Sequence, residues 1–516
     1  MHVRAFLVVL ALATMLAAGG VKAGHGASLI AVNCATDPNA LATALLTATD
    51  GDTLAIQGTC QGTFEIAHSL TLTGSAGATL DGQSTGTVLT VDSGTTVGIT
   101  ALRIRGGSGS TAGGILNNGA LTLADSTVSG NSATPGTSPN FGAGGIFNLA
   151  ASLTLTNSTV SGNTASSGVM FSTTVGGIGN CCSRGASVTL RSSTVSGNSG
   201  DALSDAFGGI LNSGSVVTAT NSTVSANRAS ATGGASAFSS AVAGISNSGG
   251  SLALTNATLA RNSVNEPNGG FLPAVGGVSN FFGGDLTAQN SLISGQSGGP
   301  NCYGLAPGSD AGYNLDDGTS CGFSTANHSL SSTDPLLDPV GLNDNGGPTQ
   351  TIALMSGSPA IDVIPPATSG CGSTISADQR GISRPQNSGC DLGAFEFVVT
   401  TLTVAIDIKP GEAPNRINPG SGGTIPVAIL SNFGFNAPSQ VDATSLEFGR
   451  TGNESSRALC SPPQDVNGDG LLDRLCHFST QKTGFQSGGS QGVLTGKTLG
   501  GTPIRGADSV EIVPPK

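Results

Sequence analysis

The sequence is poor in charged and aromatic side chains. Tryptophan is absent, tyrosine occurs twice in 516 residues, and only 10% of the residues are charged. The 19 lysines and arginines are thinly spread and the net charge is −12, so no basic patch is available to bind a phosphate backbone. We therefore expect no nucleic-acid partner.

Long apolar runs are also missing, except at the N-terminus. His2 and Arg4 precede an apolar run over residues 5–18, and small residues follow it up to Ala23. This layout predicts a secretory signal peptide over residues 1–23, removed after about Ala23. No later segment is long and apolar enough to span a bilayer. We expect a secreted or cell-surface protein without a transmembrane segment in the mature chain.

Glycine is abundant, at 80 residues, but it follows no Gly-X-Y period, which excludes collagen. The bias toward Ser, Thr, Gly, Asn and Val favours β-structure with many turns. The length leaves room for two or three domains with a sizeable core.

The ten cysteines of an exported chain are expected to form disulfides rather than to bind metal. Cys181 and Cys182 have no obvious distant partner, and they could be buried thiols, a structural link or, less simply, a redox-active vicinal bridge. Proximity suggests four other pairs, although sequence does not determine connectivity: Cys34 with Cys60, Cys302 with Cys321, Cys371 with Cys390, and Cys460 with Cys476.

A unit of 31 to 35 residues recurs from Gly113 to about Gln296. Each copy begins with GGI-x-N, continues with an LTL-like stretch and ends with a version of NSTVSGN, as at 157–163. Apolar and polar residues alternate within the unit, which indicates short strands. Because so small a unit cannot bury its own apolar face, successive units must stack. The pattern predicts an all-β fold, a parallel β-helix with one coil per repeat.

Two columns of asparagines keep the phase of the repeat. We interpret them as ladders at corners, because stacked amides can hydrogen-bond from coil to coil and asparagine tolerates left-handed backbone. The Asn-Ser-Thr of the motif also matches a glycosylation acceptor, but the copies at 125 and 192 lack the acceptor asparagine, which favours a structural role. The first column is Asn117, Asn148, Asn180, Asn212, Asn247 and Asn280, and the second is Asn131, Asn163, Asn198, Asn227 and Asn262, closed by Gln296.

Residues 24–105 precede the regular repeats, which occupy residues 106–300. Within residues 24–105, short apolar stretches predict about three less regular coils, and the pattern over Pro38–Ala48 predicts an amphipathic helix. We expect the helix to cover the open end of the stack, where strands would otherwise pair with other chains. The whole β-helix should contain about nine or ten coils.

The segment between NSTVSGN and the next Gly-Gly varies in length, so insertions collect on one edge of the solenoid, where binding loops usually lie. Each variable segment holds one phenylalanine. We interpret this row mainly as packing of the loops onto the rod, and alternatively as a sugar-binding row. The row is Phe141, Phe171, Phe207, Phe238 and Phe271.

Candidate catalytic groups are few in the repeat region, which contains five carboxylates, four arginines and no lysine. Enzymes that cleave polyuronates need clustered carboxylates and bases, so we do not favour catalysis. Asp201 and Asp205 are the best acid pair, although a solvated loop explains them more simply.

The repeats, with their GGI-x-N and LTLTNSTVSGN elements, resemble those of secreted right-handed β-helix proteins of bacteria and, more loosely, polymorphic outer-membrane protein repeats. After them, GYNLDDGTSCGF (312–323), LNDNGGPTQTIALMSGSPAID (342–362) and ADQRGISRPQNSGCDLGAFEF (377–397) resemble a choice-of-anchor domain, which covers 301–399. The resemblance implies a right-handed β-helix displayed at or beyond the cell surface. Within this segment, Asp378, Arg380, Arg384, Asp391 and Glu396 are interpreted as a hydrogen-bonded cap rather than an active site.

From about residue 400 to 516, IDIKPGEAPNRINPGSGGTIPVAIL and DVNGDGLLDRLCHF resemble a small C-terminal module of exported bacterial proteins. Its alternating short strands predict a separate β-sandwich. DVNGDGLLD suits Ca²⁺, because oxygens recur at positions 1, 3, 5, 7 and 9 of the loop and Gly470 permits the turn. The predicted ligands of this structural Ca²⁺ are Asp465, Asn467, Asp469, the carbonyl of Leu471, and Asp473.

We therefore expect an exported β-helix protein with a structural, adhesive or binding role and a calcium-stabilised C-terminal module. The partner would be a surface glycan or a protein. The alternative is a polysaccharide-active enzyme, resembling a pectate lyase or a glycoside hydrolase, that works along the loop edge.

Overall fold

The computed structural model describes residues 26–138, 140–182, 185–233, 239–399 and 401–514. They form two compact units, one of residues 26–331 with 346–350 and the other of residues 332–345 with 351–514. The predicted signal peptide and Phe238 lie outside the described residues.

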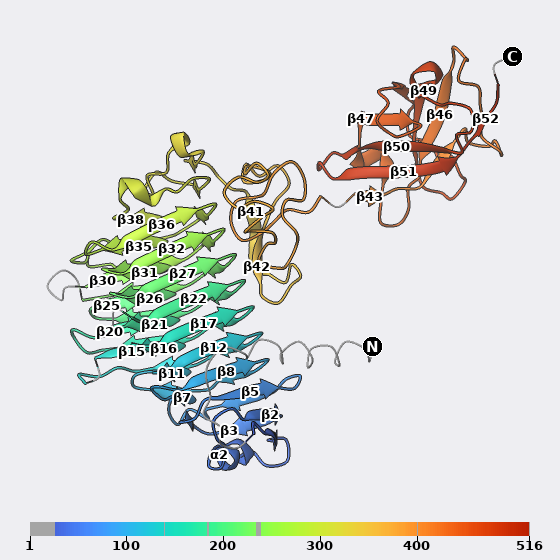
Figure 1. Cartoon of the computed structure of the whole chain (residues 1–516). Coiled ribbons are helices and arrows are strands. Elements are labelled where there is room, and N and C mark those ends of the chain that lie inside the picture. The colour runs from blue at the N-terminus through green and yellow to red at the C-terminus, as the bar shows by residue number, and fades with distance from the viewer. Residues whose placement is uncertain (1–25, 139, 183–184, 234–238, 400, 515–516) are drawn as a thin grey trace. The chain divides into compact units, whose positions relative to one another are not determined.

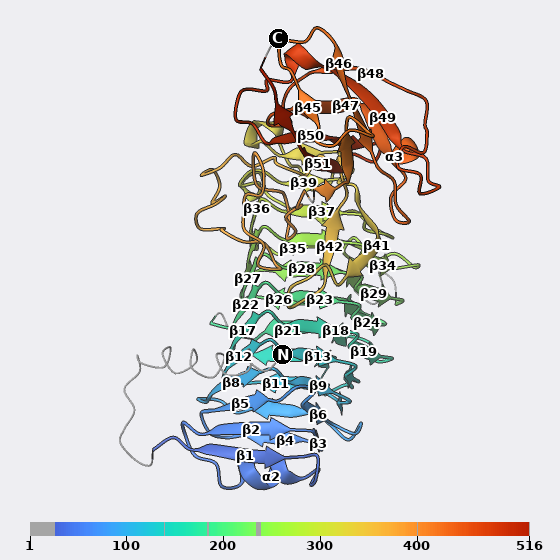
Figure 2. The same ribbon diagram turned by 90° about the vertical axis from the view of Figure 1, so that its right-hand side faces the viewer.

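The first unit is a parallel β-helix, as the repeat predicts (Figure 1 and Figure 2). A complete coil contributes one strand to each of three long parallel sheets. The first sheet contains ten strands, in agreement with the expected number of coils: β1 (Leu29–Asn33), β2 (Thr53–Gln57), β5 (Leu70–Gly74), β8 (Thr96–Thr100), β12 (Ala120–Ala124), β17 (Ser152–Thr156), β22 (Ser187–Arg191), β27 (Val216–Thr220), β32 (Ser251–Thr255) and β36 (Asp285–Gln289).

The second sheet follows the first along each coil, and the third closes the coil. The second consists of β3 (Thr59–Gln61), β6 (Thr79–Asp81), β9 (Arg103–Arg105), β13 (Thr127–Ser129), β18 (Thr159–Ser161), β23 (Thr194–Ser196), β28 (Thr223–Ser225), β33 (Thr258–Ala260), β37 (Leu292–Ser294), β39 (Leu315–Asp316) and β40 (Leu330–Ser331). The third consists of β4 (Phe64–Ile66), β7 (Leu89–Val91), β11 (Ile115–Asn117), β16 (Ile146–Leu149), β21 (Ile178–Cys181), β26 (Ile210–Ser213), β31 (Ile245–Ser248), β35 (Val278–Phe281) and β38 (Cys302–Tyr303).

The variable segments between the second and third sheets are largely strands rather than loops. Segments of neighbouring coils pair in parallel, so their backbone groups are satisfied by the coil above or below. The fourth sheet consists of β10 (Ser108–Gly109), β14 (Ser132–Ala133), β19 (Thr164–Ser167), β24 (Ser199–Ala202), β29 (Arg228–Ala231) and β34 (Ser263–Asn265). The fifth consists of β15 (Phe141–Ala143), β20 (Thr173–Val175), β25 (Asp205–Phe207) and β30 (Ser240–Val242).

The core of the rod is built from stacked aliphatic rows. Leu153 and Leu155 of β17 pair with Val188 and Leu190 of β22, and all four side chains are buried. Each such side chain contributes about 1.5–3 kcal/mol when it leaves water. Successive side chains of a strand point to opposite faces, so the alternation of apolar and polar residues in the sequence determines which face of each strand points into the core.

Both predicted asparagine columns form buried hydrogen-bonded ladders. In the first, each Nδ2 donates to the Oδ1 of the next coil, as from Asn148 to Asn180 at 2.8 Å. In the second, Asn163 donates to Asn198 at 3.0 Å, and the series ends at the Oε1 of Gln296, 3.1 Å from Asn262. The Nδ2 groups also donate to main-chain carbonyls, so each amide joins neighbouring coils.

The left-handed corner residues are not the ladder asparagines, which corrects one expectation. Positive φ occurs at the first residue of each NSTVSGN copy, including Asp125, Asn157, Ser192 and Asn221, with φ between 46° and 52°. The residue before the second ladder, such as Gly162, is left-handed as well. The ladder amides are held by hydrogen bonds between coils. The left-handed residues flank them: one position before the second column, as at Gly162, and two positions after the first column, as at Ala150 and Gly214.

A short helix and a disulfide close the β1 end of the rod. Helix α2 (Ala40–Leu45) lies within the predicted Pro38–Ala48 segment, and its Leu41 is fully buried in the rod core. Cys34 and Cys60 form a disulfide beside it. Near the other end, Cys302 bonds to Cys321, next to the 3-10 turns η3 (Pro307–Ser309) and η4 (Thr325–Asn327).

The second unit contains a hairpin of β41 (Leu337–Asn343) and β42 (Thr351–Leu354) and a separate C-terminal β-region. The two four-stranded sheets of that region share one apolar core, in which the ring centroids of Phe448 and Phe478 lie 5.1 Å apart. One sheet has the order β43 (Leu402–Thr403), β51 (Pro503–Ser509), β50 (Gln491–Thr498) and β47 (Val441–Gly449); the other has β44 (Ile406–Ile408), β46 (Thr424–Ile429), β49 (Arg474–Ser479) and β48 (Arg457–Cys460). The remaining elements are β45 (Arg416–Ile417), β52 (Glu511–Ile512), α3 (Ala437–Gln440) and η5 (Thr480–Lys482).

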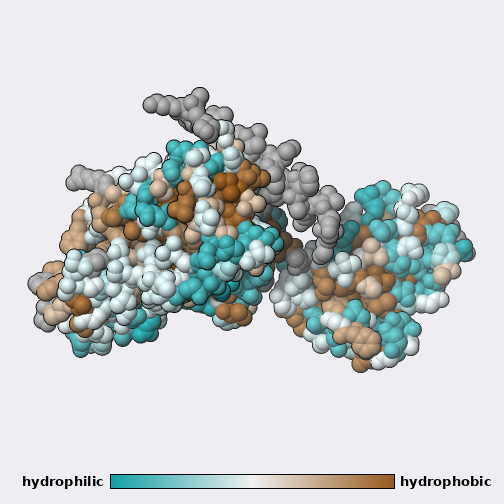
Figure 3. All heavy atoms as spheres, turned by 90° about the horizontal axis from the view of Figure 1, so that it is seen from below, coloured by the Kyte–Doolittle hydropathy of each residue, from teal (hydrophilic) through white to brown (hydrophobic). Residues whose placement is uncertain are grey.

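All four predicted disulfide pairs are present, including Cys371 with Cys390 and Cys460 with Cys476 in the second unit. On the surface seen in Figure 3, apolar side chains form separate patches among hydrophilic and intermediate ones.

Candidate functional site

Side chains of the fifth and third sheets pack against each other and line a hollow beside the rod core. The base is apolar, because Phe207 and Val242 of the fifth sheet pack with Leu211 and Phe281 of the third. Above this base the hollow is open, with a volume of about 390 Å³. We call it the phenylalanine groove, and its lining is Phe141, Thr173, Asp205, Phe207, Leu211, Ser213, Ser240, Ser246, Ser248, Phe271, Leu272, Phe281 and Phe282.

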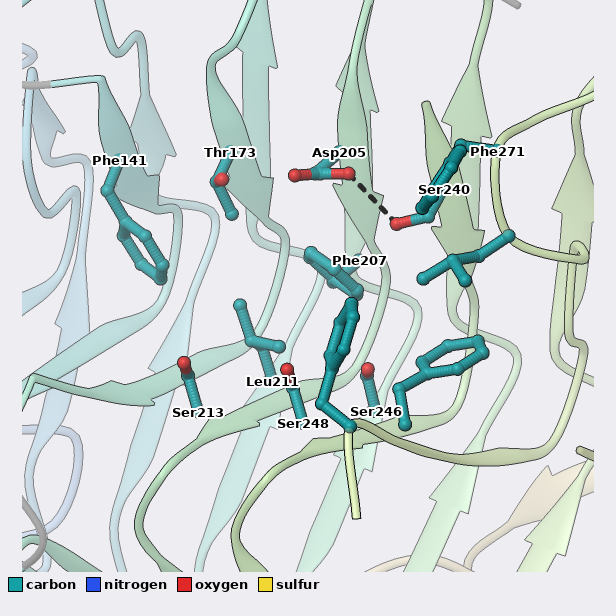
Figure 4. Close-up of a pocket in the computed structure, with 13 residues that line it drawn as sticks. Phe141, Thr173, Asp205, Phe207, Leu211, Ser213, Ser240, Ser246, Ser248 and Phe271 are labelled. Carbon is teal, nitrogen blue, oxygen red and sulfur yellow. Dashed lines mark hydrogen bonds between the residues drawn. The ribbon is translucent and has the colours of Figure 1, made fainter. Parts of the chain in front are cut away.

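The strand register places the polar lining in rows that follow the rod axis. Phe141, Thr173, Asp205 and Ser240 occupy equivalent positions on β15, β20, β25 and β30 (Figure 4). On the third sheet, a second row continues from Ser213 through Ser248 to Phe281. The groove therefore spans several coils and repeats its chemistry from coil to coil.

The aromatic rings of the groove differ sharply in exposure. Phe207 and Phe281 are 6% exposed, whereas Phe271 and Phe282 are 58% and 72% exposed. The interpretation that variable-segment phenylalanines pack onto the rod is thus correct for Phe207 and for Phe141, which stacks on Phe147 at 4.7 Å. It does not hold for Phe171, which is 61% exposed, or for Phe271.

Asp205 is the acidic group of the groove. Its Oδ1 accepts a hydrogen bond from Ser240 Oγ at 2.9 Å, and burial raises the pKa of its carboxyl group. Asp201, the proposed partner, lies on the adjacent strand β24, accepts a bond from Ser199 Oγ and does not line the groove.

Glu266 is the acid that the structure brings into electrostatic reach of Asp205. Its carboxylate accepts from Ser239 Oγ at 3.3 Å, and its pKa is raised by burial and further by Asp205. The sequence does not predict this pairing, because Glu266 lies in a variable segment, where the repeat does not show which residues of successive coils become neighbours. The described lining of the groove contains no basic side chain that would offset these two carboxyl groups.

The predicted calcium loop lies between β48 and β49. Gly468 and Gly470 have positive φ, as such a loop requires. The carboxylate of Asp465 accepts backbone N–H groups of Gly468 and Gly470, at 2.8 and 2.9 Å, so the loop curls around it.

Three of the predicted side-chain ligands converge and the fourth turns inward. Asn467 Nδ2 donates to Asp469 Oδ2 at 3.0 Å, and Asp465 bonds to the N–H of Asp469. Asp473 is fully buried and accepts the N–H groups of Ser431 and Val466. Among the described residues, no three acidic, histidine or cysteine side chains gather as a metal cluster. A cation here would also draw on the Asn467 amide oxygen and the Leu471 carbonyl.

The charged residues of the segment 332–399 form a buried network. Arg384 Nη1 donates to Glu396 Oε2 at 2.8 Å, and Asp378 pairs with Arg380 at 2.7 Å. Burial raises the pKa of Asp391 to about 7, and repulsion from Glu396 adds to the shift. The carboxylates accept backbone N–H groups from several turns, such as that of Ile382 on Asp378. This arrangement supports the interpretation as a hydrogen-bonded structural element.

Cys181 and Cys182 form a vicinal disulfide, which resolves the alternatives left by the sequence in favour of a bridge. Cys181 is buried in the apolar cluster at the base of the phenylalanine groove, and Cys182 is exposed. No free cysteine remains among the described residues.

Comparison with known proteins finds no match to any family model, curated protein or solved structure. Within the described ranges, no helix has the length and apolar character needed to cross a membrane.

Proposed function

We propose that this chain is an exported binding protein of adhesive or structural role, whose β-helix offers the phenylalanine groove to a surface or matrix partner. The exposure of Phe271 and Phe282 within one hollow carries the proposal. Apolar rings gathered in a concave site mark a binding surface more often than an incidental one. The neighbouring hydroxyls and Asp205 supply the polar groups that orient a ligand.

Export is supported by three features of the chain. The described residues contain five disulfides, which persist in oxidising compartments. The N-terminal run over residues 5–18 is typical of a secretory signal. The resemblance of 312–323, 342–362 and 377–397 to choice-of-anchor proteins favours display at or beyond the cell surface.

The test is co-sedimentation of the purified full chain with a panel of insoluble polysaccharides and matrix proteins, combined with product analysis. We expect retention on at least one material without release of new reducing ends or unsaturated sugars. Absence of retention on every material, or release of products, would contradict the proposal.

A polysaccharide-active enzyme is the second candidate. It is favoured because Asp205 and Glu266 accept hydrogen bonds from the consecutive residues Ser240 and Ser239. Two carboxyl groups with raised pKa beside one groove are the groups that glycoside hydrolysis uses. If this reading is right, soluble products will appear, and Asp205→Asn and Glu266→Gln will each abolish their formation. Asp201→Asn, which removes an equal charge outside the groove, should leave it unchanged.

We also propose that the DVNGDGLLD loop binds structural Ca²⁺ through Asp465, Asn467, Asp469, the Leu471 carbonyl and Asp473. Carboxylate oxygens have two lone pairs each, so the backbone bonds to Asp465 and Asp473 leave acceptor capacity. Bound Ca²⁺ would neutralise the carboxylates and rigidify the connection between β48 and β49.

Titration calorimetry of the full chain with CaCl₂ tests the loop. We expect one binding event that Asp465→Asn and Asp469→Asn each remove. Glu65→Gln, which neutralises an exposed carboxylate on strand β4, should bind as the unmodified chain does. Binding that survives both loop substitutions would refute the assignment.

A further inference from the structure

We propose that the phenylalanine groove binds a linear, uncharged polysaccharide that lies along the rod axis. The proposal rests on the binding function proposed above and names the class of ligand. We argue it from the exposed rings of Phe271 and Phe282, the carboxyl group of Asp205, and the hydroxyl groups of Ser213 and Ser248.

The exposed rings call for a ligand with apolar faces. Phe271 and Phe282 present more than half of their surface to solvent in the groove, beside the buried base formed by Phe207 and Phe281. Pyranose rings carry C–H groups on their faces, and these pack on aromatic rings, so stacked sugars would remove the exposed rings from water.

The rest of the lining calls for a ligand rich in hydroxyl groups. Ser213 and Ser248 are half-buried neighbours in one row, and Asp205 faces them from the fifth sheet (Figure 4). Hydroxyls both donate and accept, and a carboxylate accepts, which suits the alternating groups on the edges of a sugar. A purely apolar ligand such as an acyl chain would leave these groups unpaired.

The carboxyl groups at the groove indicate whether the bound glycan is charged or uncharged. Asp205 and Glu266 lie within electrostatic reach of each other, and the described lining holds no lysine or arginine. A polyuronate or a sulfated glycan would bring further negative charge beside two carboxyl groups without a cation to pair with. The groove therefore excludes acidic polymers and admits uncharged ones.

The backbone of the groove argues against an extended peptide. β20 and β25 are hydrogen-bonded on both sides, as are β21, β26 and β31 of the opposite wall. These interior strands have no free edge for β-augmentation, which supplies much of the affinity in peptide recognition, and in the described residues the fifth sheet has edge strands only at its two ends, β15 and β30. Recognition must come from side chains, as in glycan binding.

The rows favour a polymer over a single sugar. Three coil-to-coil steps separate Phe141 from Ser240, and at ~4.8 Å per step they span roughly 14 Å. A chain of several sugar units fills this length, so affinity should rise from monosaccharide to hexamer.

The chain offers a matched control residue for an exposed ring and for the carboxylate of the groove. Phe171 and Phe271 are similarly exposed, at 61% and 58%, but only Phe271 lines the groove. Asp201 and Asp205 lie on adjacent strands and carry the same charge, but only Asp205 lines it.

The experiment measures binding of fluorescent hexasaccharides to the full chain by polarisation. The uncharged probes are hexamers of β-linked glucose, mannose and N-acetylglucosamine; the charged ones are hexamers of galacturonate and glucosamine, with a Gly/Ser peptide as the non-sugar probe. We expect at least one uncharged hexamer to bind and the galacturonate hexamer and the peptide not to bind. Phe271→Ala, Phe282→Ala and Asp205→Asn should each weaken binding by about fivefold or more, whereas Phe171→Ala and Asp201→Asn should stay within about twofold.

Several outcomes overturn the inference. It fails if only a charged hexamer or the peptide binds, if no probe binds, or if Phe171→Ala and Phe271→Ala have equal effects. The circular dichroism spectrum of each variant should equal that of the wild-type chain. A variant with this spectrum is folded, so its loss of binding comes from the substituted side chain. If the chain is retained on the panel of insoluble materials but these variants are retained equally, the groove assignment fails and the binding function stands. If the chain is retained on nothing, both fail.

Discussion

At the scale of single residues, the buried ladder asparagines bind the coils to one another. Asn198 accepts from the N–H and the Nδ2 of Asn163 and donates to Asn227 and to the carbonyl of Val160, with all four bonds near 3.0 Å. A buried side-chain amide in this position has all its hydrogen-bond partners only while the coils above and below it stay in register. The ladder thus makes stacking specific as well as stable.

Asn198→Ala should therefore destabilise the rod by about 2–4 kcal/mol, because the buried N–H and Nδ2 of Asn163 lose an acceptor and the oxygens of Val160 and Asn227 each lose one donor. Urea unfolding followed by circular dichroism measures the effect. Asn118→Ala, next to the first ladder but half-exposed, is the control and should change stability by less than about 0.5 kcal/mol. Equal losses in the two variants would contradict the ladder's role.

Asp391 predicts a pH dependence of the second unit. Its pKa rises from 3.8 to about 7 in the folded chain, so between these values the folded state binds a proton that the unfolded state has lost. This contribution to stability is complete below pH 4 and declines as the pH rises to about 7. Burial raises the pKa of Glu396 too, and so shifts stability in the same direction.

Calorimetric melting at pH 4, 5.5 and 7 checks this sign. The transition of the second unit should fall in temperature as the pH increases, and Asp391→Asn should flatten the decline. An unchanged slope in the variant would show that another group is responsible.

At the scale of elements, the paired glycines of GGI-x-N allow the chain to enter the third sheet. A Cβ atom at Gly209 would lie 2.5 Å from the carbonyl oxygen of Gly244 in the next coil. Successive coils are only ~4.8 Å apart, so the backbone cannot withdraw to make room. The glycines are required by this close approach and not by unusual φ values.

Gly209→Ala should cost about 1–3 kcal/mol through this clash. Gly136→Ala is the control, because a Cβ there meets no atom within 4 Å and the position should tolerate it. Thermal melting of the two variants distinguishes the effects, and equal melting temperatures would mean that the coils can separate at this corner.

At the scale of the whole rod, the exposed end of the stack must be covered. Strand β1 is the edge of the first sheet, and α2 places Leu41 over the core at this end. An uncovered end would offer unpaired strands and apolar side chains to another copy of the chain.

Leu41→Asp should therefore loosen α2 and produce concentration-dependent association, measured by light scattering after size-exclusion chromatography. Leu46→Asp introduces the same charge one residue beyond α2, at a side chain that is 87% exposed, and should remain in the state of the unmodified chain. Association of both variants would attribute the effect to charge alone.

The sequence by itself determined the β-helix, its coil number, the two ladders, the end helix and four disulfide pairs. Each of these depends on a feature that recurs or lies close in the chain: a period, an alternation of side chains or a pair of nearby cysteines. In a solenoid, residues one period apart become neighbours, so spacing along the sequence translates directly into contact.

Only the tertiary structure decided where the candidate site lies. Asp205 lies within electrostatic reach of Glu266, Phe271 stays exposed while Phe207 is buried, and Asp473 is buried between its own loop and Ser431. These outcomes depend on segments whose length and phase vary between coils, and on a hydrogen bond between residues 42 positions apart in the C-terminal region. Where no period relates two residues, only the packing of the folded chain brings them together.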